Sequence, residues 1–404
     1  MDTHTIIAEK CVFGGNCFTK IDGKVVFIPF AVPGETLEIE ITESSGDYDN
    51  AIIRSIAVPS PHRVVPPCEF YGTCGGCTMM HIDTAFQKEL RLQMLRDVFL
   101  RAGITVSEIK IISGADFHYR CRIQLNNGGF SKRASNECVP ITGCSVAETC
   151  INEWLSSVPA EERPKGRCQL FGSSKVIEAG GKAGCSVAVL RGQAEKKTVS
   201  LPQKNARHIK PARKRYAGTV LSEEDIVTVE LLGKKISFDI RGFFQSNLEV
   251  LEKAINEICR GLKGSSVLDM YAGCGTFSVF LSDRFEKTTL VEHNRDALVF
   301  AEKNLIGKNH ESVGLSGAKW ASEHPDAYFD AAVIDPPRSG MEKEVRDYFC
   351  RSGIPHIRAL SCNPATQARD IAALLKAGYM IERMYLLDFY PNTSHIESLV
   401  VLEK

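Results

Sequence analysis

From residue 241 onward, short apolar runs alternate with segments of helical pattern, and this alternation restricts the possible folds more than any other feature. Strands that alternate with helices along a chain form a parallel, doubly wound α/β sheet. The four strand-like runs are Ser266–Met270, Thr289–Glu292, Ala331–Asp335 and Ile357–Ser361. Ligands of such sheets lie just beyond the carboxyl ends of the strands. The residues that follow these runs are therefore the first candidates for a functional site.

A glycine-containing loop follows the first run. Within Asp269–Phe277, Gly273 and Gly275 stand at a strand-to-helix turn, where the backbone can come close to a ligand. Glu292 ends the next run about 20 residues later, where it could accept hydrogen bonds from ribose hydroxyls. The last glycine of the dinucleotide fingerprint is missing, because Phe277–Ser278 stand in its place. The pattern therefore favours an adenosyl ligand without a pyrophosphate.

Other runs are followed by residues that can carry out chemistry. Two prolines follow Asp335 and fix the backbone around its carboxylate, with a helix cap as the alternative interpretation. Cys362 comes directly after the last run and Pro364 stops the strand there, so its thiol is placed to act as a nucleophile. Glu397 lies just before the terminal apolar strand. The alternatives for the last two are a buried structural cysteine and a surface glutamate.

A second group of cysteines lies nearer the N-terminus. Its three members are Cys68, Cys74 and Cys77. Two glycines between the last two let the backbone turn tightly around a metal centre. A fourth ligand has to come from elsewhere, and we choose Cys144 over Cys138 and Cys150. The chain has 15 cysteines and no recognisable secretory signal, which favours metal or catalytic roles over disulfides. An iron–sulfur cluster is favoured, and zinc or inert thiols are the alternatives.

The preceding 240 residues have a different organisation. Residues 1–60 alternate apolar and polar side chains between glycine-containing turns, which is typical of a small antiparallel barrel. Residues 84–102 have the pattern of an amphipathic helix closed by Gly103, and we expect this helix to pack on the α/β domain. Residues 117–240 are β-rich in pattern. The expected domains are 1–60, 61–240 and 241–404.

Charge and hydropathy limit the possible partners. The formal net charge is +0, which neither requires nor excludes nucleic acid. Residues 191–215, however, hold nine Lys or Arg and a single acid, Glu195. Such a cluster suits phosphate binding, and a solvated linker is the alternative. No run of about 18 apolar residues is present, so we expect a cytoplasmic protein without a membrane span.

Five motifs of this chain follow one another in the order found in one enzyme family. They are the three-cysteine run with Cys144, Phe243–Asn247, Tyr271–Phe277, Asp335–Arg338, and Ser361–Pro364 with His395–Glu397. Over nearly its whole length the chain resembles the SAM-dependent RNA (uracil-5-)-methyltransferases, in the branch with a TRAM domain and a [4Fe–4S] cluster. The resemblance implies a C-terminal α/β Rossmann-like SAM methyltransferase domain, an N-terminal TRAM/OB-like β-barrel and a β-rich central domain that carries the cluster.

The resemblance also implies roles for individual residues. Cys362 is the nucleophile that adds to C6 of uracil, and Glu397 is the base that removes the C5 proton. The implied cluster ligands are Cys68, Cys74, Cys77 and Cys144. The implied contacts to S-adenosyl-L-methionine (SAM) are Gln245, Tyr271, Thr276, Glu292 and Asp335. Relatives place an acidic or amide residue near the adenine, and residues 315–323 of this chain offer no clear counterpart.

The implied substrate is a structured RNA whose target base has to leave its stack. The cluster-bearing branch favours 23S rRNA, and the T-loop of tRNA is the runner-up. No membrane and no obligate protein partner are expected. A catalytically silent iron–sulfur RNA-binding protein is another possibility, but Cys362, Glu397 and the cofactor residues occur together and argue against it. Methylation of an exocyclic amino group is disfavoured, because Arg338 stands where such enzymes carry an aromatic residue.

Overall fold

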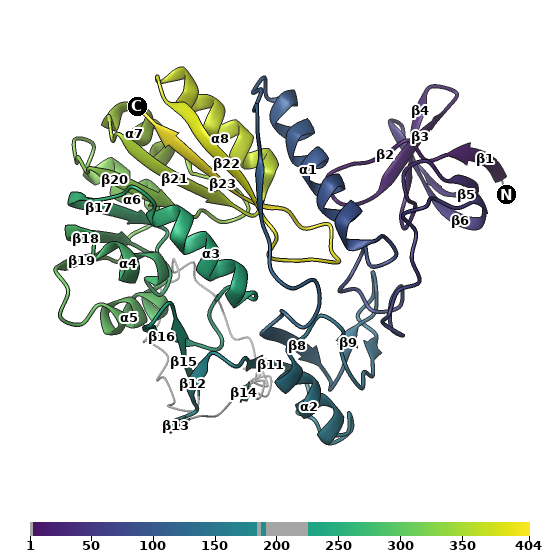
Figure 1. Cartoon of the computed structure of the whole chain (residues 1–404), viewed down its shortest axis with the longest axis horizontal. Coiled ribbons are helices and arrows are strands. Elements are labelled where there is room, and N and C mark those ends of the chain that lie inside the picture. The colour runs from purple at the N-terminus through teal and green to yellow at the C-terminus, as the bar shows by residue number, and fades with distance from the viewer. Residues whose placement is uncertain (1–2, 184–186, 191–224) are drawn as a thin grey trace, which may run out of the picture.

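The structure is a computed structural model that describes residues 3–183, 187–190 and 225–404. Figure 1 shows its three parts: a sheet formed by the N-terminal residues, a central region of short strands, and a large sheet flanked by helices. The basic stretch 191–215 lies outside the described residues. No helix in the described part of the chain is long and apolar enough to cross a membrane.

Residues 3–58 form the N-terminal sheet. Its strands are β1 (Thr3–Ile7), β2 (Lys10–Cys11), β3 (Cys17–Ile21), β4 (Lys24–Ile28), β5 (Thr36–Ser44) and β6 (Tyr48–Val58). They lie in the order β1-β5-β6-β4-β3-β2, and all neighbours are antiparallel except β4 and β6. Ile28, Leu37 and Ile39 are buried in its core. Cys11 and Cys17 face each other on β2 and β3 and form a disulfide, which the sequence interpretation did not include.

A long helix, α1 (Thr84–Arg101), follows the cysteine run. It begins at Asp83, whose side chain accepts a hydrogen bond from the backbone N–H of Phe86 at 2.8 Å. It ends before Gly103, which adopts a φ of +77°. Glycine adopts such a φ without strain because it has no side chain. Figure 1 shows α1 between the N-terminal sheet and the large sheet, where it packs against α8 (Pro364–Lys376). Two of its buried side chains, Gln87 and Arg91, are polar.

The central region is built from short strands and one helix. Its elements are β8 (Arg122–Asn126), β9 (Phe130–Ser131), β10 (Cys138–Val139), α2 (Thr149–Ser157), β11 (Arg167–Gly172), β12 (Val176–Ala179), β13 (Lys182–Ala183), β14 (Val187–Leu190), β15 (Ile226–Leu231) and β16 (Lys234–Asp239). The strands form sheets of order β10-β9, β14-β11-β8 and β13-β12-β15-β16. A small core that includes Leu125, Ile151 and Leu170 lies between α2 and these strands.

The large sheet contains the four strands predicted from the apolar runs. Its strands are β7 (Lys110–Ile112), β17 (Gly264–Met270), β18 (Phe285–Val291), β19 (His310–Val313), β20 (Ala331–Ile334), β21 (His356–Ser361), β22 (Met380–Leu387) and β23 (Glu397–Glu403). The helices around it, besides α1 and α8, are α3 (Leu248–Cys259), α4 (Thr276–Leu281), α5 (Arg295–Asn304), α6 (Gly317–Glu323) and α7 (Lys343–Ser352). The strand order is β19-β18-β17-β20-β21-β23-β22-β7.

The alternation of strands and helices predicted a parallel sheet, but the observed sheet is only partly parallel. β19, β18, β17, β20 and β21 run parallel, but β23 runs antiparallel between β21 and β22. The chain returns from β22 to β23 through residues 388–396 without a crossover helix, and only an antiparallel pair permits so short a return. A buried antiparallel strand is as uniformly apolar as a parallel one, so the direction of the strand cannot be inferred from the sequence pattern.

Candidate active site

Cys362 occupies the tight turn between β21 and α8. The side chain of Asn363 caps α8 by accepting a hydrogen bond from the backbone N–H of Ala365 at 3.1 Å, and Pro364 opens the helix. The hydroxyl of Ser361 accepts a hydrogen bond from the backbone N–H of Asn363 at 3.0 Å. Cys362 is therefore held from both sides at the carboxyl end of a buried strand, with its thiol half-buried.

Glu397 is brought to Cys362 by the antiparallel direction of β23. Ser361 pairs with Ser398 in the register of β21 and β23, so the next step outward sets Cys362 opposite Glu397. Glu397 is the first residue of β23, and its side chain is buried. A parallel strand would have put its start at the opposite edge of the sheet. The departure from the predicted topology is thus what brings thiol and carboxyl together.

Both residues line one cavity of about 670 Å³. Four of the five residues that the family resemblance assigned to SAM line the same cavity, and these are Gln245, Tyr271, Glu292 and Asp335. The fifth, Thr276, is not among the lining residues, and its hydroxyl lies 3.4 Å from the sulfur of Cys274. The residues that follow four different strands therefore meet in a single pocket at the carboxyl edge of the sheet.

Two carboxyl groups of this pocket, those of Glu397 and Asp335, hold their protons unusually firmly. Burial, followed by the nearby charge of Asp335, raises the pKa of Glu397 to about 8, and a 3.3 Å hydrogen bond from the side-chain nitrogen of Gln245 opposes the rise. Burial alone raises the pKa of Asp335 to about 7. Carboxyl groups with pKa values near neutrality are suited to accept and release protons during a reaction.

The thiol of Cys362 is also kept protonated in this pocket. Burial, and then the carboxyl charges of Glu397 and Asp335, raise the pKa of Cys362, while the positive charge of Arg338 lowers it. A thiolate is the nucleophilic form of cysteine. Neutral carboxyl groups beside Arg338 would therefore favour ionisation of the thiol.

Hydrogen bonds fix the side of the pocket that is formed by the loop after β17 and the end of β18. The carboxylate of Glu292 accepts hydrogen bonds from the backbone N–H groups of Gly273 at 3.0 Å and Asn294 at 2.6 Å. Tyr271 adopts a φ of +66°, which is unusual for a residue other than glycine, and its hydroxyl donates to Glu342. The loop after β17 and the end of β18 are thus joined into one rigid rim.

Several lining residues were not assigned to the site from the sequence. Phe243 has 71% of its surface exposed, and its place in the Phe243–Asn247 motif was the signal that could have found it. Arg120 lines both this pocket and the cysteine cavity. Leu315 and Gly317 line the part of the wall where the sequence offered no acid or amide.

The four cysteines proposed as cluster ligands line a separate cavity of about 440 Å³, and these are Cys68, Cys74, Cys77 and Cys144. Cys138 and Cys150 are not among its lining residues. Among the described residues, no group of three or more His, Cys, Asp or Glu side chains has the spacing that holds a metal ion. The four cysteines line one space, and the predicted metal centre is not shown by this structure.

Comparison with known proteins places this geometry among RNA-modifying enzymes. The family model described as tRNA (Uracil-5-)-methyltransferase matches residues 324–404, the methyltransferase small domain matches 248–351, and the TRAM domain matches 5–51. An uncharacterized RNA methyltransferase of Treponema denticola is 34% identical, and the alignment covers 100% of both chains. The 23S rRNA (uracil(1939)-C(5))-methyltransferase RlmD of Shewanella amazonensis is 30% identical over 94% of this chain and 91% of its own length.

The fold has a solved counterpart. The crystal structure of Pyrococcus abyssi tRNA (uracil-54, C5)-methyltransferase in complex with S-adenosyl-L-homocysteine matches with a TM-score of 0.71 and 21% sequence identity. The match covers 99% of this chain and 100% of the other. The N-terminal barrel and the C-terminal methyltransferase fold predicted from the sequence are thereby confirmed.

Proposed function

The chain belongs to the SAM-dependent RNA (uracil-5-)-methyltransferases, and on this premise we propose that it methylates C5 of a uridine in 23S rRNA through a covalent adduct with Cys362. The observation that carries the proposal is the pairing of Cys362 and Glu397 across β21 and β23, at one wall of a pocket whose other wall is the glycine-containing loop. A nucleophile and a base on adjacent strands are what a reaction at two neighbouring ring carbons requires.

The proposed reaction begins with the thiolate of Cys362. It forms a bond to C6 of uracil, and the C5–C6 electron pair moves to make C5 nucleophilic. C5 would then take the methyl group of SAM, whose sulfur keeps the electrons of the broken S–C bond and leaves as S-adenosyl-L-homocysteine. Glu397, in its ionised form, removes the remaining proton from C5, the electrons of the C5–H bond restore the double bond, and the C6–S bond breaks to return the thiolate. Atoms and electrons balance without an external oxidant or reductant.

The remaining pocket residues are proposed to bind and orient. Glu292, already held by two backbone N–H groups, presents its carboxylate toward the space where a ribose would lie. Tyr271, Gln245 and Asp335 line the same space, and we propose that they contact the cofactor or the uracil ring beside it. Thr276 lies away from the lining, which argues against the direct contact that the resemblance implied.

We propose further that a [4Fe–4S] cluster occupies the cysteine cavity. Its ligands would be Cys68, Cys74, Cys77 and Cys144, which line the cavity while the alternatives Cys138 and Cys150 do not. Zinc would use the same four thiolates, each about 2.3 Å from one ion, and is the alternative. Methyl transfer involves no net change in electrons, so the group would serve structure.

The RNA target is proposed from the relatives. Several of them that match nearly the full chain are 23S rRNA (uracil(1939)-C(5))-methyltransferases, whereas the structural counterpart that acts on tRNA is 21% identical. The T-loop of tRNA is therefore the second candidate. The test is to incubate the purified protein with SAM labelled in the methyl group and with unmodified 23S rRNA or tRNA, and then to map 5-methyluridine. Label in 23S rRNA is expected, with Cys362→Ala as the control, and label in tRNA alone would overturn the choice of substrate.

A further inference from the structure

The loop that leads into Glu397, residues 388–396, is tied down mainly by residues outside the active site. We propose that Asn392 and Thr78 are positioning residues: together they hold this loop so that Glu397 stands within reach of the C5 proton. The inference rests on the proposed function, because it assigns Glu397 the role of base. Neither residue lines the active-site pocket.

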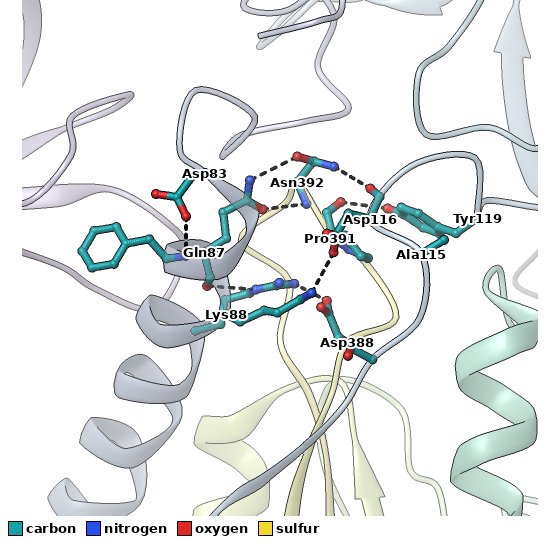
Figure 2. Close-up of polar contacts among 12 residues, drawn as sticks. Asp83, Gln87, Lys88, Ala115, Asp116, Tyr119, Asp388, Pro391 and Asn392 are labelled. Carbon is teal, nitrogen blue, oxygen red and sulfur yellow. Dashed lines mark hydrogen bonds and ion pairs between the residues drawn. The ribbon is translucent and has the colours of Figure 1, made fainter. Parts of the chain in front are cut away.

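Asn392 is the centre of the attachment, as Figure 2 shows. Its backbone N–H donates to the side-chain oxygen of Gln87 at 2.9 Å, and its side-chain oxygen accepts from the Gln87 nitrogen at 3.1 Å. Its side-chain nitrogen donates to the carbonyl oxygen of Asp116 at 2.7 Å. Its carbonyl accepts from the backbone N–H groups of Thr78 at 3.1 Å and Met79 at 3.0 Å. Every polar group of this buried residue is therefore used, by three separate segments.

The backbone at Asn392 requires this residue type or glycine. Its φ is +65°, in the left-handed region that asparagine tolerates better than most side chains. A residue in this conformation bends the loop sharply, and the surrounding hydrogen bonds have to keep it there. The sharp bend turns the chain back toward the start of β23, five residues further on.

Thr78 holds the loop at a second point. Its hydroxyl oxygen accepts a hydrogen bond from the backbone N–H of Ser394 at 2.9 Å. Ser394 is also covered by the turn between β2 and β3, where a side-chain carbon added to Gly15 would lie 2.4 Å from the Cβ of Ser394. Thr78 directly follows Cys77 in the chain, so the loop is attached to the end of the cysteine run.

Two further contacts flank this attachment. Arg91 and Asp388 form an ion pair of 2.6 Å, with side chains that are 1% and 0% exposed, at the start of the loop. The hydroxyl of Tyr119 donates to the carbonyl of Pro391 at 2.9 Å. The segments drawn in Figure 2 thus come from α1, from residues 115–119 and from the loop itself.

Glu397 depends on these contacts of the loop because its own side chain makes few hydrogen bonds. In the part of the chain that the structure describes, its carboxyl group has one recorded side-chain hydrogen bond, the 3.3 Å contact with Gln245. A base has to lie within about 2.6–3.2 Å of the proton it removes, and a displacement of about 1 Å can cost a hundredfold in rate. Cys362 is held separately, by the turn between β21 and α8. Loosening residues 388–396 should therefore impair proton removal more than adduct formation.

The test uses two variants that leave the backbone path intact. Asn392→Gly adopts the same φ freely and keeps the backbone hydrogen bonds, but loses both side-chain bonds. Thr78→Val keeps the shape and loses the hydroxyl that accepts from Ser394, whereas Thr78→Ser retains a hydroxyl. Thr42→Val is the matched control, because the hydroxyl of Thr42 donates to the carbonyl of Asn50 at 3.2 Å in the N-terminal sheet, remote from the loop.

Three quantities are measured on the full-length protein with a 23S rRNA fragment tritiated at C5 of uridine. Tritium release into water reports proton removal, the denaturation-resistant protein–RNA complex reports the adduct, and calorimetry reports SAM binding. In Asn392→Gly and Thr78→Val, tritium release should slow by about tenfold or more while the adduct forms normally and accumulates. Thr78→Ser and Thr42→Val should behave like wild type, and SAM affinity should stay within about twofold in all variants.

Other results overturn the proposal in distinguishable ways. Normal tritium release in both variants rejects the positioning role. An equal loss of adduct formation, SAM binding and melting temperature shows that the two residues serve only folding. If Thr78→Ser releases tritium as slowly as Thr78→Val, the hydroxyl of residue 78 does not hold the loop. If the wild-type protein releases no tritium and forms no adduct, the proposed function itself fails, and the inference fails with it.

Discussion

At the scale of single residues, Cys362 can be replaced with little disturbance. The turn around it is fixed by bonds of Ser361 and Asn363, and none of them uses the thiol. We expect Cys362→Ala to reduce methyl transfer by about a thousandfold or more, since the covalent route is lost, while SAM affinity stays unchanged. Methylation assays measure the methyl transfer, and calorimetry measures the SAM affinity. Near-normal turnover in this variant would exclude the covalent mechanism.

Glu397 should give a different result, because in the proposed mechanism it acts after the adduct has formed. Glu397→Gln keeps the size of the side chain and a possible contact with Gln245, but cannot accept the C5 proton. We expect a protein–RNA adduct that survives denaturation to accumulate, with turnover lowered by about a hundredfold or more. Gel electrophoresis under denaturing conditions detects it. Glu382→Gln, on the exposed side of β22, is the control and should turn over normally.

The buried carboxyl of Glu397 also predicts how stability depends on pH. Its pKa rises from 4.5 to about 8 on folding, so within this window the folded protein keeps a proton that the unfolded chain has lost. The stability contributed by the neutral carboxyl is complete below pH 4.5 and disappears as the pH rises through about 8. Relative to Glu397→Gln, wild type should lose up to about 1.4 kcal/mol per pH unit in this window. Denaturant unfolding of both proteins across it measures the difference, and parallel curves would contradict the assignment.

Sequence reasoning could reach some residues of the site and not others. Cys362, Asp335 and Glu292 were found because each ends or follows an apolar run, and strand ends are where sites of such sheets lie. Asn392 and Gln87, which are 305 residues apart, could not be found in this way. Their contact depends on how α1 docks, and no local pattern encodes a distance across the whole chain.

At the scale of elements, the same contrast holds. The bounds of α1 were predicted to within one residue because its apolar side chains follow the helical period and Gly103 closes the helix. The antiparallel insertion of β23 was missed, because strand direction is set by which neighbours the strand can pair with. Yet that direction is what places Glu397 opposite Cys362. The feature of the fold that most affects the chemistry is thus one that periodicity does not report.

The docking of α1 on the loop 388–396 gives a prediction about stability. Arg91 and Asp388 are both buried, and removing one leaves the other as an unpaired charge. We expect Arg91→Met to lower the free energy of unfolding by about 3–5 kcal/mol, and the double variant with Asp388→Leu to recover much of the loss. The exposed pair of Lys10 and Asp97 is the reference, and Lys10→Met should cost about 1 kcal/mol or less.

Denaturant titration separates these outcomes. If Arg91→Met costs no more than Lys10→Met, the buried pair does not hold α1 to the loop. If the double variant is as unstable as the single one, the loss comes from packing, since the long side chain of Arg91 also fills space beside Gln87.

At the scale of the whole molecule, the cysteine cavity is lined by residues between 68 and 146, and some of its neighbours contact the other two parts of the chain. The apolar group around Cys68, Cys77 and Cys144 includes Tyr119, whose hydroxyl bonds the loop before β23. Tyr71 also lines the cavity, and its ring packs edge-on against that of Phe30 in the N-terminal part, with ring centres 5.6 Å apart. A group bound in this cavity would therefore brace the barrel, the central region and the active-site loop against one another.

This arrangement gives the last prediction. Cys77→Ser should reduce the iron content of anaerobically purified protein to background and abolish its visible absorption band, because a cluster at this site needs all of its thiolates. Cys138→Ser, whose exposed thiol lies outside the cavity, should keep both signals. If the wild-type protein contains zinc instead of iron, the cysteines form a metal site but do not hold an iron–sulfur cluster. Because Cys77 adjoins Thr78, loss of the bound group should also slow proton removal more than SAM binding, which links the cavity to the chemistry through the loop.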